Sequence, residues 1–240
     1  ERLPDYWNMI YGDRHYDLMG YLGQRQLYML DIGCGSGRAL KRFTELGWLV
    51  DGVEPSSLAI KRLNDSWKAE EFPDIYEGYF EEVNLDPGYS VVYCEQVLSH
   101  MTNLERNLRK MCNLLVPGGL IFIEEPNDYS YLQRRVVERK LNKPEYWLTE
   151  DHVNYGSFDF WTTQLKRAGF QILDCQATWP MEWFVLSGDN YFGDDEVGKV
   201  CHEKRYRMLS SLDYRKRVEL GRFFARIGIG RDVVILAQKK

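Results

Sequence analysis

The chain has 240 residues, of which 44% are hydrophobic, and its net charge is −5. This length suits one domain, or one domain with a small cap, and the hydrophobic content is enough for a buried core. The negative charge argues against nucleic acid as a partner, and no run approaches the roughly 20 apolar residues of a membrane-spanning helix, so we expect no membrane span.

The first two thirds of the chain alternates between strand and helix patterns. Tyr28–Ile32 is a short apolar run that predicts a buried strand. Ser36–Leu46 follows with helical spacing, and Gly47 is a residue type that ends helices. The alternation continues with expected strands at Trp48–Val53, Ile75–Phe80, Val91–Cys94 and Leu120–Glu124, and with expected helices beginning at Ser56 and spanning Leu104–Leu115, the latter stopped by Pro117-Gly118-Gly119.

The last third adds one helix and two strands around an irregular region. Ser157–Ala168 is expected to be a helix, Phe170–Cys175 a sixth strand, and Asp232–Gln238 a seventh strand that closes the sheet. Residues 178–230 are rich in aromatic and charged side chains and are expected to form a helical insertion between the last two strands. The predicted fold class is therefore α/β: one domain over residues 1–240, with a doubly wound, mostly parallel, seven-stranded Rossmann-like sheet.

The cysteines give no sign of a disulfide framework or a metal site. All five are scattered without C-x-x-C spacing, which predicts reduced thiols and a cytoplasmic location. Cys201-His202 is a lone adjacent pair, and a zinc site needs a second pair of ligands. We therefore expect no bound metal.

A glycine-rich turn follows the first predicted strand. Leu30–Gly37 reads L-D-I-G-C-G-S-G, in which three glycines separate a strand from a helix. Glycine permits a tight turn and a close approach of the backbone to a ligand, which then meets the free N–H groups at the start of the helix. Glu54 ends the next strand, where a carboxylate can accept hydrogen bonds from both hydroxyls of a ribose. The turn and the acid predict a nucleoside cofactor, and the G-x-G-x-G spacing differs from the G-x-G-x-x-G of NAD or FAD sites.

From about Tyr28 to Asp174 the sequence resembles the class I S-adenosylmethionine (SAM)-dependent methyltransferases. The similarity is carried by several short segments in the family's order. These are Asp31–Gly37, Val50–Glu54, Val91–Met101 with Glu95, Leu98 and His100, Leu114–Gly119 followed by Pro126-Asn127, and His152–Tyr155 followed by Gly169-Phe170. The resemblance implies SAM as the cofactor and methyl transfer as the reaction.

The resemblance also implies which residues hold the cofactor. Asp31 would orient the glycine loop or hold the methionine amino group, and Glu54 would hold the ribose. The expected cofactor-binding residues are Asp31, Gly33, Cys34, Gly35, Gly37, Glu54, Pro55, Tyr79, Phe80, Glu95, Gln96 and Tyr11. Two positions depart from the family's pattern: Tyr79, or less directly Glu81, stands where an acid often borders the adenine, and Ser90 stands where an aspartate often begins the fourth strand.

Two interpretations remain open for the aromatic residues that precede the first strand. Tyr6, Trp7 and Tyr11 could form a lid over the cofactor, with an aromatic face near the sulfonium. They could equally belong to an amphipathic helix that packs on the sheet.

The candidate catalytic residues are His152, His100 and Glu124. A hydroxyl acceptor is helped by a general base, and histidine titrates near neutral pH. Each candidate has a structural alternative: His100 shapes the cofactor pocket, His152 orders a lid, and Glu124, with Glu125 and Asp128, caps a loop. Positioning of the acceptor alone is a further alternative.

The insertion is expected to set the acceptor. Met181, Glu182, Trp183, Asp189, Asn190 and Tyr191 combine apolar anchors with polar groups, as ligand pockets do. The basic residues Lys204, Arg205, Arg207 and Arg215–Arg217 either hold a phosphate or form a solvated helix face.

The sequence predicts methyl transfer to a hydroxyl or amine of a small molecule, such as a sugar, a nucleotide-linked sugar or a glycan end. One alternative is a nucleic-acid methyltransferase, which for base amino groups would carry a Pro-Pro-aromatic motif where this chain has Cys94–Val97. Others are a non-catalytic SAM-binding module, which predicts a damaged cofactor motif, and a nicotinamide dehydrogenase, which the glycine spacing disfavours.

Overall fold

The computed structural model describes residues 4–23, 27–67 and 72–240. The strands are β1 (Tyr28–Ile32), β2 (Leu49–Glu54), β3 (Ile75–Glu77), β4 (Tyr89–Glu95), β5 (Leu115–Pro126), β6 (Phe170–Ala177) and β7 (Asp232–Lys239). The helices are α1 (Pro4–Leu22), α2 (Arg38–Glu45), α3 (Ser57–Ser66), α4 (Leu104–Leu114), α5 (Tyr131–Glu138), α6 (Phe158–Arg167), α7 (Glu182–Leu186), α8 (Asp195–Ser210) and α9 (Tyr214–Arg226), with a 3₁₀ turn at Leu98–His100.

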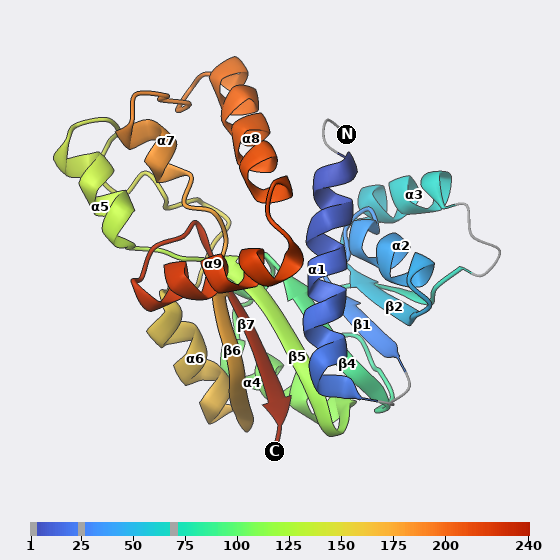
Figure 1. The fold of residues 1–240 in the computed structure, drawn as a ribbon. Helices are drawn as coiled ribbons and strands as arrows, with labels where there is room; N and C mark the ends of the chain where they lie inside the picture. Colours follow the sequence, from blue (N-terminus) through green and yellow to red (C-terminus); the bar gives the residue numbers. More distant parts are fainter. Residues whose placement is uncertain (1–3, 24–26, 68–71) are drawn as a thin grey trace.

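The strands form one seven-stranded sheet in the order β3-β2-β1-β4-β5-β7-β6. Strands β1 to β5 run parallel, whereas β7 lies antiparallel between β5 and β6. The chain order reverses between the neighbours β1 and β4, and in such sheets ligands bind beyond the carboxyl ends of the strands at this place. The predicted α/β class and the seven mostly parallel strands are confirmed (Figure 1).

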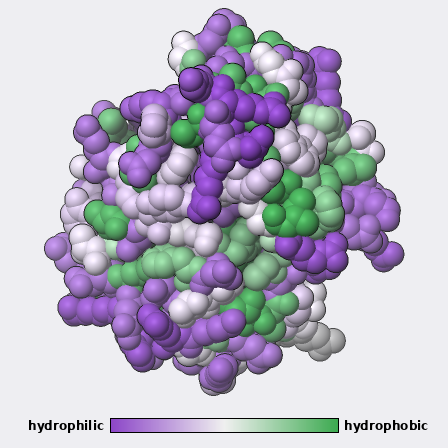
Figure 2. Space-filling model, turned by 90° about the vertical axis from the view of Figure 1, so that its left-hand side faces the viewer, coloured by the Kyte–Doolittle hydropathy of each residue, from purple (hydrophilic) through white to green (hydrophobic). Residues whose placement is uncertain are grey.

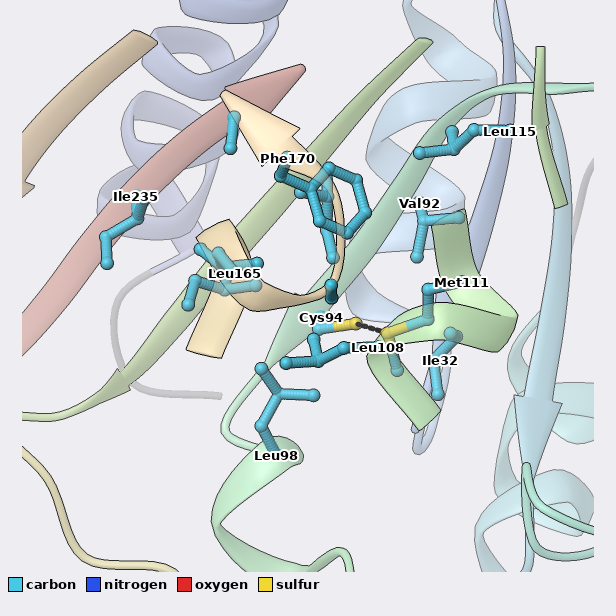
Figure 3. Packing of buried hydrophobic residues seen from close by; sticks show 14 of the residues in the cluster. Ile32, Val92, Cys94, Leu98, Leu108, Met111, Leu115, Leu165, Phe170 and Ile235 are labelled. Carbon is cyan, nitrogen blue, oxygen red and sulfur yellow. Dashed lines mark hydrogen bonds between the residues drawn. The ribbon is translucent and has the colours of Figure 1, made fainter. Parts of the chain in front are cut away.

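Alternating residues of the central strands face two separate apolar cores. On β4, Val91 and Tyr93 join the cluster that α1 and α2 cover, whereas Val92 and Cys94 join the cluster that α4 and α6 cover. Figure 3 shows part of the second cluster, where Leu98, Leu108, Met111 and Leu165 surround Val92 and Cys94. Burial on both faces explains why these strands read as continuous apolar runs in the sequence.

The chain between β6 and β7 forms the helices α7, α8 and α9, here called the insertion, which extend the domain beyond the sheet. Helix α9 packs on β6, and α8 contacts both α1 and, through Cys201 and Phe184, α7. In Figure 1, α7 and α8 stand above the carboxyl ends of the parallel strands, with α9 crossing the sheet in front. The insertion therefore forms a cap over the end of the sheet where a ligand is expected.

Some predicted boundaries are wrong. The third strand stops at Glu77 rather than Phe80, because the chain turns at Gly78, whose φ is 140°. The fifth strand begins at Leu115 rather than Leu120, and Pro117-Gly118-Gly119 lies inside it, where the pairing with β4 is irregular. Ser56 is the N-cap of α3, as predicted, and its Oγ accepts a hydrogen bond from Ala59 N.

None of the described helices is both long and apolar enough to cross a membrane. The face on the side of α5, α6 and α7 is mostly hydrophilic, with hydrophobic residues gathered in several smaller patches (Figure 2). Scattered apolar patches of this kind are ordinary on protein surfaces.

Helix α1 is joined to the sheet by a buried arginine. Arg14 donates through Nη1 to Tyr93 Oη at 2.6 Å and to Glu95 Oε2 at 2.9 Å, and through Nη2 to Glu124 Oε2. The Arg14 side chain is 6% exposed, and that of Glu124 is 10% exposed. Breaking a buried pair is costly because the remaining charge keeps no partner.

We expect Arg14→Met to lower the free energy of unfolding by about 3–5 kcal/mol, because two carboxylates would stay enclosed without their cation. The measurement is urea unfolding at neutral pH. Arg109→Met is the matched control, since Arg109 pairs with Glu105 on the surface of α4 and such pairs contribute less than about 1 kcal/mol. Equal losses in the two variants would contradict the anchoring role of Arg14.

Candidate active site

The glycine loop between β1 and α2 has the backbone that only glycine adopts readily. Gly33, Gly35 and Gly37 have φ values of 72°, 54° and 76°. A Cβ at Gly33 would lie 2.4 Å from Val97 Cγ2, and one at Gly37 would lie 2.4 Å from Leu63 Cδ1. A Cβ at Gly35 would meet no described atom within 4 Å. The middle glycine therefore borders open space, while the outer two are required by packing.

The acid at the end of β2 is fastened to this loop. Glu54 Oε2 accepts a hydrogen bond from Gly35 N at 2.8 Å, and Glu54 Oε1 accepts one from Ser56 N at 2.8 Å. Gly33 N and Cys34 N both donate to Val53 O, at 2.8 and 3.1 Å. The carboxylate predicted to hold a ribose is thus fixed in one orientation beside the loop, and each oxygen keeps a further lone pair.

Three carboxylates gather at the carboxyl ends of β1, β2 and β4. Burial raises the pKa of Asp31 well above its ordinary value, and the nearby charges of Glu95 and Glu54 raise it further, while Arg14 opposes them. Glu95 Oε2 also accepts hydrogen bonds from Tyr11 Oη at 3.2 Å and Tyr93 Oη at 3.1 Å. A positively charged ligand would relieve this accumulation of negative charge.

A cavity of about 700 Å³ lies beside Glu95, while Asp31 and Glu54 do not line it. Its walls come from α1, from the ends of β4, β5 and β6, from residues 146–152, and from α7, α8, α9 and the start of β7. Tyr6 and Trp7 of α1 line it, whereas Tyr11 packs in the core against Phe43. The N-terminal helix therefore packs on the sheet, and two of its aromatic residues also line the cavity.

The cavity wall holds buried polar atoms without a hydrogen-bond partner in the described part of the chain. They include Trp147 Nε1, Trp179 Nε1, His152 Nδ1, Glu182 Oε2 and Arg205 Nε. Leaving such groups unpaired is costly, so their concentration in one cavity points to a polar ligand. Donors and acceptors are both present, which suits a ligand with hydroxyl groups.

His100 and His152 meet although they are far apart in the sequence. Their ring centroids lie 4.6 Å apart, edge to face. Ser99 O accepts hydrogen bonds from Val153 N at 2.8 Å and Asn154 N at 3.0 Å, so the two segments are held together by the backbone. Of the two histidines, His152 lines the cavity.

The two histidine rings have different surroundings. Burial lowers the pKa of His152 below its ordinary value of 6.5, and the neighbouring His100 lowers it further. His100 Nδ1 lies 3.0 Å from Asp151 O. His100, Asp151 and His152 bring candidate metal-ligand atoms within 4.8 Å of one another, a grouping that the sequence did not predict.

A buried acid holds the segment that carries His100. Glu125 accepts hydrogen bonds from the backbone N–H groups of Val97, Leu98 and Ser99, at 2.9, 2.7 and 3.1 Å. Burial raises the pKa of Glu125 to about 7. Its place in the structure matches the loop-capping alternative rather than a function in proton transfer.

The remaining predicted residues have varied surroundings. Tyr79 is 64% exposed after β3, whereas Phe80 is 3% exposed and belongs to the core, so its ring is enclosed by protein. Cys34 is buried and Pro55 is exposed. Gln96 has a φ of 59°, rare for a residue other than glycine, and its Nε2 donates to Asp232 Oδ1 at 3.1 Å.

Comparison with known proteins identifies the family. Residues 13–174 match the family described as "Methyltransferase domain". The chain belongs to this family. The match contains the glycine loop, Glu54, both histidines and the strands β1 to β6 up to Asp174.

Individual relatives of similar sequence are also methyltransferases by name. The chain is 34% identical over 103 residues to a ubiquinone biosynthesis O-methyltransferase of Bradyrhizobium sp. (strain ORS 278), a match that covers 42% of this chain and 40% of that protein. It is 30% identical over 102 residues to the enzyme of the same name from Rhodopseudomonas palustris (strain HaA2), with the same coverage. The matches thus span less than half the length of these relatives.

The fold is also that of solved methyltransferases. The structure of a SAM-dependent methyltransferase from Archaeoglobus fulgidus superimposes with a TM-score of 0.60, covering 97% of this chain and 94% of that one at 18% identity. At this identity the likeness concerns the fold alone. Fold and family together imply S-adenosylmethionine as the cofactor.

The described residues fit this cofactor. The sulfonium and ammonium groups of SAM are cationic, and Asp31, Glu54 and Glu95 bring three carboxyl groups together, of which Glu95 also pairs with Arg14. The fixed Glu54 carboxylate has lone pairs for ribose hydroxyls, and the open space at Gly35 leaves room beside the loop backbone. Asp31, Glu54 and Glu95 are therefore the residues that would hold the charged and sugar parts.

We expect Gly35→Ala to weaken binding of S-adenosylhomocysteine, the demethylated product of SAM, by about tenfold or more, because the added methyl group would occupy ligand space. Calorimetric titration measures the affinity. Gly47→Ala is the matched control, since Gly47 has a φ of 84° and equally open surroundings but lies at the end of α2. Equal affinities of the two variants would show that Gly35 does not border the cofactor.

Proposed function

We propose that the protein transfers the methyl group of SAM to a hydroxyl, or an amine, of a polar small molecule such as a sugar or a nucleotide-linked sugar. The observation that carries this proposal is the cavity of about 700 Å³ that adjoins Glu95 and contains unpartnered donors and acceptors. Aromatic side chains, including Tyr146, Trp147 and Trp179, form much of its wall. Aromatic faces and mixed polar groups together suit a ring that carries hydroxyls.

A hydroxyl acceptor is supported by the curated relatives, which are O-methyltransferases by name. When bound, SAM supplies a methyl group that its sulfonium already activates. The chain must then hold the acceptor oxygen about 3–3.5 Å from that methyl group and in line with it. It must also exclude water. Helices α1, α7 and α8 form part of the cavity wall and so limit the access of water.

His152 is the residue that we assign to proton removal from the acceptor. Its ring lines the cavity, Nδ1 has no hydrogen-bond partner among the described residues, and its lowered pKa keeps the ring neutral at pH 7. A neutral imidazole accepts a proton as the hydroxyl attacks. His100 is then a positioning residue, because it contacts the His152 ring and influences its pKa.

Glu124 is better suited to positioning than to proton transfer. Its carboxylate is buried and paired with Arg14, which also holds Glu95. Burial raises the pKa of Glu124, while the attraction of Arg14 lowers it. The guanidinium remains charged in proteins, and its bonds to Glu95 and Glu124 fix the cofactor side of the cavity.

A nucleic-acid acceptor is disfavoured by the charges of the cap. Lys204 pairs with Asp189, Arg207 with Glu203, and Lys216 with Glu219. Basic side chains with local acid partners offer little attraction to a phosphate backbone. Together with the net charge of −5, these pairs support the solvated-face alternative for Lys204, Arg207 and Lys216.

The test of the function is transfer of a labelled methyl group from SAM to acceptors. The panel contains glucose, glucose 1-phosphate, a nucleotide-linked hexose, a catechol and a duplex oligonucleotide. We expect incorporation into a hydroxylated small molecule and none into the oligonucleotide. Binding of S-adenosylhomocysteine without transfer to any acceptor would favour a non-catalytic binding module, and labelling of the oligonucleotide would overturn the assignment.

The assignment of His152 predicts a pH dependence. Because the neutral ring is the active form, kcat/KM should rise with pH, with a midpoint below 6.5, the ordinary value. We expect His152→Gln to lower kcat by about 100-fold or more and to remove this rise. His100→Gln should keep most of the rate and move the midpoint upward, since His100 lowers the pKa of His152. The opposite pattern in the two variants would identify His100 as the base.

A further inference from the structure

Four arginines line the acceptor cavity, and their charges are compensated unequally. Arg14 pairs with Glu95 and Glu124, and Arg217 pairs with Asp13 at 2.6 Å. Within residues 4–23, 27–67 and 72–240, no carboxylate lies within 4.0 Å of the guanidinium of Arg205 or Arg231. Two cations are therefore available to a ligand at the end of the cavity formed by α8 and the start of β7.

Arg205 is held in the cavity wall by contacts other than an ion pair. It is 9% exposed, its Cζ lies 4.6 Å from the centroid of the Tyr6 ring, and its Nη2 lies 3.0 Å from His202 Nδ1. Its Nε is buried without a hydrogen-bond partner among the described residues. The side chain is thus both fixed and incompletely satisfied, as expected of a group that awaits a ligand.

Arg231 precedes β7 and remains accessible from the cavity. Its side chain is exposed to the cavity that it lines. Burial opposes the charge of Arg231, but the nearby acids Asp232 and Glu182 favour that charge, and its pKa is raised. Asp232 accepts hydrogen bonds from Gln96 Nε2 at 3.1 Å and Thr178 Oγ1 at 2.8 Å, which hold its carboxylate toward β4 and β6. Burial raises the pKa of Glu182, although the charge of Arg231 opposes this rise.

The charges of both arginines influence His202. Burial lowers the pKa of His202, and the charges of Arg205 and Arg231 each lower it further. A neutral His202 can accept from Arg205, which keeps that guanidinium directed along the wall. The positive charge of this region therefore rests on the two arginines, in contrast to the acidic cofactor side around Asp31 and Glu95.

We propose that Arg231 and Arg205 form an anion-binding subsite within the acceptor cavity, which holds a phosphate or carboxylate group of the methyl acceptor. A guanidinium presents several N–H donors in one plane and so binds either anion with two hydrogen bonds. Such a subsite would hold an anionic group of the acceptor, whereas the carboxylates Asp31, Glu54 and Glu95 belong to the cofactor side, where Glu95 lines the cavity. This inference rests on the proposed function and narrows it to acceptors that carry a negative charge.

The test compares three probes of similar shape: glucose, glucose 1-phosphate and glucuronate. Each is titrated into the full chain in the presence of S-adenosylhomocysteine, and binding is followed by calorimetry. We expect at least one charged probe to bind about 10–100-fold more tightly than glucose, because it gains charge-assisted hydrogen bonds. Preference for glucose 1-phosphate identifies a phosphate subsite, and preference for glucuronate identifies a carboxylate subsite.

Variants separate the subsite from a general effect of charge. Arg231→Met should remove the advantage of the charged probe, Arg231→Lys should restore part of it, and Arg205→Met should reduce it. Arg207→Met is the control, since Arg207 lies on the same helix but pairs with Glu203 on the surface. We expect that control to bind all three probes as the parent does.

The failure of this proposal is distinguishable from failure of the proposed function. Equal affinity of the parent for all three probes, or an undiminished advantage of the charged probe in Arg231→Met, would overturn the subsite. In either case, binding of S-adenosylhomocysteine and methyl transfer to an uncharged acceptor would still support the function. Loss of S-adenosylhomocysteine binding in the parent would instead count against the function itself.

Discussion

The site depends above all on one buried guanidinium. Arg14 comes from the N-terminal helix, and the carboxylates that it binds end two neighbouring strands of the sheet. Because the guanidinium bonds all these partners at once, the position of α1 is coupled to the carboxyl ends of β4 and β5. The aromatic side chains Tyr6 and Trp7 of the same helix cover the cavity. The helix that covers the cavity and the carboxylates on the cofactor side therefore belong to one network of charged side chains.

The cavity has its charge distribution because acids and bases come from different parts of the chain. The acids Asp31, Glu54 and Glu95 end strands of the sheet, which is the part shared with other methyltransferases. The bases Arg205 and Arg231 lie on α8 and before β7, beyond the matched residues 13–174. A shared sheet thus supplies the cofactor end, and the insertion with the last strand supplies the end that selects the acceptor.

The fold and the cofactor loop could be predicted from the sequence because their signals are local. The apolar runs indicate the strands, and three glycines before a helix indicate the turn, because glycine permits the positive φ values found there. The network of Arg14 could not be predicted, since Glu95 and Glu124 lie 81 and 110 positions away and no local pattern joins them. The family resemblance implied that Phe80 borders the adenine, and the core packing that encloses its ring could not be predicted from the sequence. For the histidines, the residue types were informative, whereas their meeting depends on backbone bonds to Ser99 O.

The position of β7 has a consequence for how the molecule is made. This strand follows all the other described elements in the sequence, yet it lies between β5 and β6 in the sheet. During synthesis from the N-terminus, the long apolar strand β5 must remain without this neighbour until residues 232–239 have been added. An unpaired apolar edge of this kind is prone to association with other chains, and pairing between distant segments is slow. The newly made chain therefore passes through a vulnerable interval, which ends only when the strand that follows Arg231 enters the sheet.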